Sequence, residues 1–152
     1  MAAEDDVVVA RNRKARHDYE ILETLEAGLV LKGAEVKSVR EGNVNLKDGY
    51  ATVERGEAYL HNVHISPYDP ANRWNVDPVR RRKLLLNRHE IRILVSQTQE
   101  KGLTVVPLDV HFRHGFAKVT LAVARGKKHY DKREAIRRRE LDREAERQMG
   151  RR

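Results

Sequence analysis

The sequence predicts a mainly β protein, a closed antiparallel barrel of the OB type with one or two packed helices. Two pairs of alternating runs, each joined by a short turn that contains glycine, predict two β-hairpins. A helical pattern precedes the second hairpin, and 152 residues are enough for one ordinary domain. Closing an antiparallel sheet into a barrel also removes its exposed edges.

The composition divides the chain into three parts. We predict a flexible N-terminal arm over residues 1–15, an OB-like barrel over 16–125 and a basic tail over 126–152. The absence of cysteine excludes disulfides and thiolate metal sites. The acidic start of the chain is unlike a secretory signal, and no apolar run approaches the roughly 20 residues of a membrane span. We therefore expect a cytoplasmic protein that does not bind membranes.

The first elements are two extended runs and a short helix. HDYEILETL predicts a strand, EAG at 26–28 a turn, and LVLK a further extended segment. GAEVKSVREG predicts a short helix, because Val36 and Val39 share one helical face and Gly42 supplies a stop.

The two hairpins are the strongest patterns. In YATVERGEAYLHNVHI the alternating runs 50–54 and 58–65 flank a turn with Gly56. LTVVPLDVHF and FAKVTLAVA form the second pair around a turn with Gly115. We expect about five or six strands in all.

An exposed loop and a capped helix separate the hairpins. Residues 66–82 contain three prolines and no apolar period, which predicts a loop. Asn87 and Glu90 form a capping-box pattern, and a helix should run from there to a stop at Gly102.

Charge points to a polyanionic partner. The formal net charge is +8 and the pI about 9.9, values typical of nucleic-acid-binding proteins. From Arg125 to the C-terminus there are twelve basic and six acidic residues, so the tail carries +6 and the rest of the chain only +2. A tail that merely maintains solubility is the simpler alternative.

The tail has the residues of a helix but no face to bury. Arg139 and Arg143 belong to a series of arginines four residues apart, and like charges at that spacing cost about 0.2–0.5 kcal/mol per pair in water. Phosphates along the same stripe would reverse the sign of this term. We expect a tail that is disordered alone and helical on RNA. A membrane surface is a weaker alternative, because the non-basic face lacks large apolar residues.

The sequence favours no catalytic residue, metal or cofactor. Its seven histidines include His61 with His64 and His111 with His114, but residues three apart on a strand point to opposite faces. A ribonuclease-like pair of histidines remains an open alternative, although no motif brings two of them together.

Two basic segments are candidates for contact with RNA. NRKARHDY, residues 12–19, mixes cationic donors with two flat rings, which can hold phosphates and stack on bases; an ordinary solvated strand entry is equally compatible with the pattern. In RRRKLLLN, residues 80–87, four cations precede three leucines. If Leu84 and Leu86 are core, Leu85 is exposed beside the cations; if the leucines begin the helix, it is not.

Six motifs, in order, resemble the small protein B family of bacterial SsrA-binding proteins, partners of transfer-messenger RNA. They are NRKARHDY, GAEVKSVREG, NVHISPY, the D-P-x-R-x-RKLLL run at 77–86, VPLDVHF and GKKHYDKR, and the likeness covers residues 11 to about 148. The chain departs from the family pattern at Val76, where a histidine is expected, and at His111, where a tyrosine is common.

The resemblance implies an OB-type barrel that binds the tRNA-like part of transfer-messenger RNA without catalysis. As a monomer when free, the protein would deliver this RNA to stalled ribosomes, its tail entering the empty decoding centre and message channel. The implied RNA contacts of the body are Asn12, Arg13, Lys14, Arg16, His17, Glu26, Arg82, Lys83 and Leu85. The implied ribosome contacts of the tail are Lys127, Lys128, Tyr130, Asp131, Lys132, Arg133, Arg139 and Arg143.

Glu26 is unusual for an RNA contact. Its carboxylate could accept from a base amino group or a sugar hydroxyl, or it could orient nearby Arg or Lys side chains. Two other functions stay open at this stage: a generic single-strand RNA-binding or ribosomal protein, and an RNA-processing enzyme that uses His17 or the later histidines.

Overall fold

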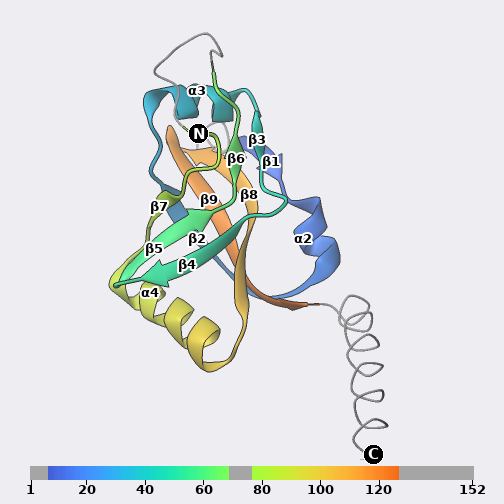
Figure 1. The fold of residues 1–152 in the computed structure, drawn as a ribbon, viewed down its shortest axis with the longest axis vertical. Helices are drawn as coiled ribbons and strands as arrows, with labels where there is room; N and C mark the ends of the chain where they lie inside the picture. Colours follow the sequence, from blue (N-terminus) through green and yellow to red (C-terminus); the bar gives the residue numbers. More distant parts are fainter. Residues whose placement is uncertain (1–6, 69–76, 127–152) are drawn as a thin grey trace, which may run out of the picture.

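The computed structural model describes residues 7–68 and 77–126. The strands in these ranges are β1 (Val7–Arg11), β2 (Tyr19–Leu29), β3 (Val44–Asn45), β4 (Tyr50–Glu54), β5 (Glu57–His61), β6 (His64–Ile65), β7 (Arg82–Leu85), β8 (Thr104–Arg113) and β9 (Phe116–Gly126). The helices are α2 (Arg13–Asp18), α3 (Gly33–Arg40) and α4 (Arg88–Val95), and a π-helical turn, Ser96–Glu100, extends α4 (Figure 1).

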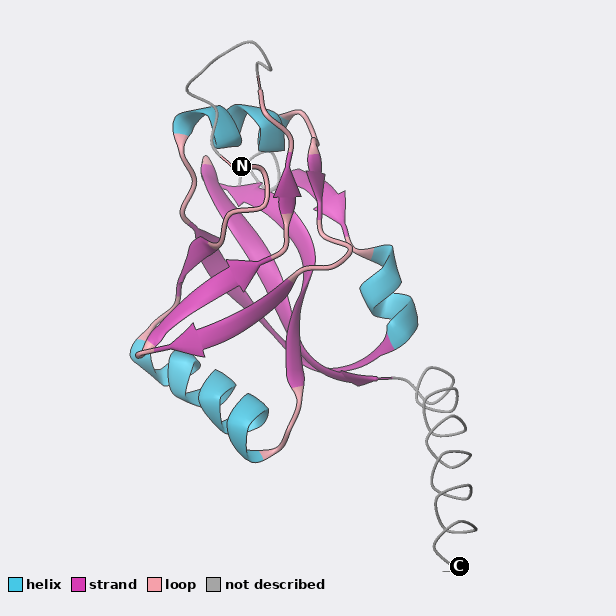
Figure 2. Cartoon of the chain, viewed as in Figure 1, coloured by secondary structure: helices cyan, strands magenta, loops and turns pink. Residues whose placement is uncertain are grey.

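Seven of these strands form one antiparallel sheet in the order β1-β8-β9-β2-β7-β5-β4, and β3 pairs separately with β6. The prediction of a mainly β fold is confirmed, and the helices lie at separate places around the strands (Figure 2). The predicted closed barrel is wrong. Although β4 lies against β8, no ladder of hydrogen bonds joins the two ends of the sheet within the described ranges.

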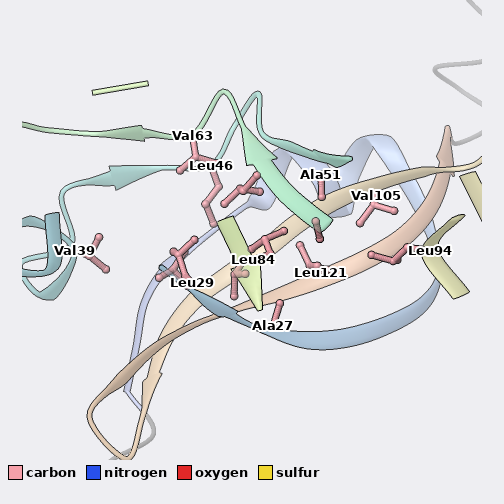
Figure 3. Packing of buried hydrophobic residues seen from close by; sticks show 14 of the residues in the cluster. Ala27, Leu29, Val39, Leu46, Ala51, Val63, Leu84, Leu94, Val105 and Leu121 are labelled. Carbon is pink, nitrogen blue, oxygen red and sulfur yellow. The ribbon is translucent and has the colours of Figure 1, made fainter. Parts of the chain in front are cut away.

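The inner face of the sheet carries the main hydrophobic core (Figure 3). Alternate residues of each strand enter it, for example Ala27 and Leu29 of β2 and Val119 and Leu121 of β9. Leu94 of α4 and Val39 of α3 pack against the same core, which explains why these two short helices form. The residues between the core positions therefore belong to the opposite, outer face.

Both predicted hairpins are confirmed, although the second run of the first one, predicted over 58–65, ends at His61, and His64–Ile65 pairs with β3 instead. β4 pairs with β5, and β8 pairs with β9. Gly56 and Gly115 in the two turns have φ of +79° and +82°, which glycine adopts without steric cost. The predicted helices are also present, and in α4 the Asn87 side chain accepts from Glu90 N at 2.8 Å while the Glu90 carboxylate accepts from Asn87 N at 3.0 Å.

The predicted turn at 26–28 is wrong, because β2 continues without interruption to Leu29. Gly28 lies within the strand, opposite Leu85 of β7. A bulge between Ile21 and Glu23 shifts the alternation of β2, which explains why the apolar pattern at the start of this strand was irregular.

The predicted arm is too long. Val7–Arg11 pairs with β8 as strand β1, and Ala15 of α2 is buried, so residues 7–15 belong to the folded body. Residues 1–6 lie outside the described residues.

The predicted loop and tail are described only in part. Of the loop, residues 69–76 lie outside the description, and its last residue, Arg82, is the first residue of β7. The tail from residue 127 onward lies outside the description as well, so the predicted ribosome contacts stay predictions.

Candidate nucleic-acid interface

The outer face of the sheet gathers candidate residues from several strands. Thr120 of β9 lies opposite Glu26 of β2 on one side and Asp109 of β8 on the other. On β7, Leu84 enters the core, so its neighbours Lys83 and Leu85 are on the outer face. Residues that are far apart in the sequence thus share one surface.

Helix α2 covers one end of the same face. Its residue Ala15 packs in a second apolar cluster formed by Val106, Leu108, Ala122 and Ala124, all on the outer side of β8 and β9. Ala15 faces the sheet and Asp18 is half-buried, whereas the other residues of this short helix are exposed, namely Arg13, Lys14, Arg16 and His17. The helix therefore presents a cluster of cationic and imidazole groups at the edge of the outer face.

A pocket of about 330 Å³ lies beside α2. Lys14 of α2 and Tyr19 of β2 line it on one side, and Lys47 and the first residue of β4, Tyr50, line it on the other. The ammonium of Lys14 is 3.7 Å from the carboxylate of Asp48 across this hollow, and both side chains are at least half exposed. Such a pair is weak in water and leaves Lys14 available to a phosphate.

Asn12 is buried and does not reach the surface. Its amide nitrogen donates to Leu46 O at 3.0 Å and Pro107 O at 2.8 Å, and its Oδ1 accepts from Ala15 N at 3.0 Å. Since all of these groups are engaged inside the protein, the implied role of Asn12 as a direct RNA contact is wrong. Asn12 caps α2 and fixes the helix to the sheet.

Arg82 is also buried, with a relative exposure of 0%. Its guanidinium donates to Glu35 Oε2 through Nε at 3.0 Å and through Nη2 at 2.8 Å, and Nη1 donates to Val63 O at 2.6 Å. The side chain therefore points to the inner face, and its implied contact with RNA is wrong. The extended backbone explains the error, because successive cations of the RRRK run point to opposite sides.

Of the two alternatives predicted for Leu85, the structure shows the exposed one. Leu84 lies in the core, and Leu85 is 56% exposed. It lies over Gly28, where an added Cβ would come within 3.1 Å of the Leu85 Cβ. Lys83 is beside it on the same face, with Nζ 3.0 Å from Glu57 Oε1. An exposed apolar side chain next to a cation suits contact with a nucleotide.

Glu26 is held by an imidazole and a guanidinium group. His111 Nε2 is 2.6 Å from Glu26 Oε2, and Arg113 Nη2 is 3.3 Å from the same oxygen. Burial acts to raise the pKa of Glu26, but the hydrogen bond with His111 and the charge of Arg113 outweigh it and hold the pKa below its ordinary value. The carboxylate is thus ionised and remains 32% exposed.

The motif analysis missed the role of His111. This residue is buried and joins Glu26 on one side to Asp109 on the other, where Nδ1 is 2.7 Å from Oδ1. The only signal in the sequence was its alternation with Asp109 and Arg113 along a predicted strand, which places all three on one face.

The outer face continues over the first hairpin. Tyr59 of β5 lies under the guanidinium of Arg81, which is 4.0 Å from the ring centroid, and Tyr50 of β4 stacks on His61 with ring centroids 5.0 Å apart. Arg81 also pairs with Glu54 at 2.8 Å. The flat rings of this region are already stacked on side chains of the protein.

The described residues contain no group of histidine and carboxylate side chains placed to hold a metal ion. None of the helices in the described ranges is long and apolar enough to cross a membrane. A basic helix beside a mixed polar and apolar sheet face instead defines a small β protein of the polyanion-binding class.

The chain belongs to the SmpB protein family, whose profile matches residues 9–151. It is 61% identical over 140 residues to an SsrA-binding protein of Geobacillus thermodenitrificans, which covers 92% of this chain and 90% of that protein. An SsrA-binding protein of Streptococcus mutans is 58% identical over 142 residues, with 93% and 92% covered.

A solved structure described as "tmRNA-SmpB: a journey to the center of the bacterial ribosome" has the same fold. It superposes with a TM-score of 0.70 at 55% sequence identity, covering 85% of this chain and 94% of that one.

Proposed function

We propose that this protein binds transfer-messenger RNA through the outer face of its sheet and delivers it to stalled ribosomes for trans-translation. It acts as a monomeric, non-catalytic adaptor in the cytoplasm. The body holds the tRNA-like part of the RNA, and the C-terminal tail contacts the decoding centre and the message channel. Membership of the family of SsrA-binding proteins supports this function, together with the grouping of seven implied contacts on one side of the body.

That grouping is the observation that carries the proposal. Of the nine body contacts implied by the family motifs, only the two buried residues are unavailable to RNA. The others are at least partly exposed, on α2 or on the outer face of the sheet: Arg13, Lys14, Arg16, His17, Glu26, Lys83 and Leu85. One RNA molecule can therefore contact α2 and the outer face of the sheet at the same time.

The tail has a separate role. The segment from Arg125 to the C-terminus has a net charge of +6, against +2 for the rest of the chain, and a basic segment of this kind gains free energy from counterion release when it lies along RNA. We propose that Tyr130 stacks on a base of the decoding centre and that Asp131, Lys132 and Arg133 position the tail at its entry.

The division of labour is tested with two full-length charge reversals. Arg16→Glu on α2 should weaken binding of transfer-messenger RNA by about tenfold or more, since one favourable phosphate contact becomes a repulsion. Lys132→Glu combined with Arg133→Glu should leave that affinity within about twofold, because these residues contact the ribosome, not the RNA body. Filter binding measures affinity, and a reconstituted translation reaction stalled on a truncated message measures tagging.

The tail variant should lose tagging despite normal RNA binding. If it loses both activities equally, the assignment of separate surfaces is wrong. An unrelated structured RNA serves as the competitor; equal affinity for both RNAs would indicate a generic RNA-binding protein.

A further inference from the structure

We propose that His111 is a positioning residue for RNA recognition: as an imidazolium held between Asp109 and Glu26, it aims the free oxygen of Glu26 at an N–H or O–H donor of the RNA. The inference rests on the proposed function and adds a residue and a chemical group to it. The donor is an N–H group of a base or a ribose 2′-hydroxyl, since these RNA groups can donate to a carboxylate.

Both ring nitrogens of His111 are engaged by carboxylates. Nε2 lies 2.6 Å from Glu26 and Nδ1 lies 2.7 Å from Asp109. An ionised carboxylate can only accept, so the imidazole donates to both carboxylates only when each of its nitrogens carries a proton. The Asp109 oxygen also accepts from Thr120 Oγ1 at 3.0 Å, which orients Asp109 in turn.

The two oxygens of Glu26 are used differently. Oε2 accepts from His111 and lies 3.3 Å from Arg113, while no donor among the described residues makes a hydrogen bond to Oε1. Because about a third of the side chain is exposed, Oε1 remains open to a ligand. A carboxylate with one oxygen bound by the protein and the other open is oriented as a single acceptor.

The charges around this cluster favour an anion at neutral pH. They come from all four strands of this part of the sheet: Arg11 on β1, Asp109 and Arg113 on β8, Lys118 on β9 and Glu26 on β2. Among the described residues around this cluster, three cationic side chains face two carboxylates. An RNA phosphate can therefore approach Glu26 without net repulsion from these groups.

A double-mutant cycle in the full-length protein tests whether His111 acts through Glu26. We expect Glu26→Gln to weaken binding of transfer-messenger RNA by about tenfold, the scale of one hydrogen bond to a charged group. His111→Gln should weaken it by about fivefold on the same scale. In the Glu26→Gln background, His111→Gln should have no further effect, since coupled residues are not additive. Two independent, multiplicative losses would overturn the proposal, and so would unchanged affinity in His111→Gln.

Asp109→Asn provides a second variant should His111→Gln fail to fold. It removes the other carboxylate that holds the imidazolium and should weaken binding in the same direction, with no effect in the Glu26→Gln background. Unchanged binding in Asp109→Asn, or a further loss in the Glu26→Gln background, would overturn the proposal. If Glu26→Gln itself leaves affinity unchanged while Arg16→Glu weakens it, His111 has no role in recognition but the proposed function stands. A wild-type protein with no preference for transfer-messenger RNA contradicts the proposed function itself.

Discussion

Glu35 and Glu26 are two carboxylates held by cationic side chains, and their surroundings give them different roles. Glu35 of α3 is 2% exposed, and both of its oxygens accept from Arg80 or Arg82. Glu26 of β2 is 32% exposed and uses one oxygen. A saturated carboxylate on the inner side can only hold the protein together, whereas a half-used carboxylate on the outer side can also bind a ligand.

The Glu35 cluster connects elements that are distant in the sequence. Arg82 of β7 reaches α3 through Glu35 and the turn between β5 and β6 through Val63 O, and the same guanidinium donates to Pro78 O at 3.0 Å. Burial acts to raise the pKa of Glu35, but hydrogen bonds from Arg80, the Lys32 amide and Arg82 lower it below its ordinary value of 4.5. This ionised network is part of the fold.

Replacing Arg82 should have the largest effect on stability. Arg82→Ala leaves the Glu35 carboxylate buried with one cation fewer and opens a cavity, which costs about 3–5 kcal/mol. Urea unfolding measures the loss. Arg81→Ala, at the exposed neighbouring position on the opposite face, is the matched control and should leave the urea midpoint nearly unchanged. If the two variants have similar urea midpoints, the buried arginine of the inner face contributes no more to stability than the exposed arginine of the outer face.

The Glu35 cluster should also make stability fall in acid. The pKa of Glu35 is lower in the folded protein than its ordinary value of 4.5. Its contribution to the free energy of unfolding is therefore fully present above about pH 4.5 and is lost as the pH falls through the folded pKa. In Glu35→Gln, which has no such carboxylate, the stability deficit relative to wild type should therefore shrink below that pH. Urea unfolding at a series of pH values measures the difference, and a deficit constant across the series would contradict the prediction.

Sequence reasoning found the local elements because their causes are local. Glycine in the turns, alternation in β8 and β9, and the Asn87–Glu90 pair each act over a few residues, and all three predictions are confirmed. The same reasoning misread 26–28 as a turn, because Gly28 is required by a strand 57 positions later: it gives room to Leu85. The closed barrel failed for a similar reason, since closure depends on pairing between distant strands.

The candidate site was recovered through family motifs more than through physical pattern. Motifs name positions but not the direction of a side chain, so Asn12 and Arg82 were grouped with exposed neighbours although both are buried. His111 was missed because its partners, Glu26 and Asp109, meet only after β8, β9 and β2 align. Burial and long-range register are the two properties that the sequence does not display.

Replacing Lys83 should have the smallest effect on RNA binding, and it tests directly whether RNA contacts the outer face of the sheet. It follows Arg82 directly but lies on the outer face, with about 44% of its side chain exposed. If it neutralises one phosphate, Lys83→Ala should reduce the slope of log affinity against log salt by about 0.7–0.9. Arg88→Ala, an exposed cation on α4 away from the outer face, is the control and should not change the slope.

Glu57 refines the same measurement, because its carboxylate lies 3.0 Å from Lys83 Nζ and competes with a phosphate for that ammonium. Glu57→Gln should therefore strengthen RNA binding slightly in the wild-type background and have no effect in Lys83→Ala. Both titrations use full-length protein and transfer-messenger RNA at several salt concentrations. An unchanged slope in Lys83→Ala, or the same gain from Glu57→Gln in both backgrounds, would place Lys83 outside the RNA surface and confine recognition to α2 and the Glu26 cluster.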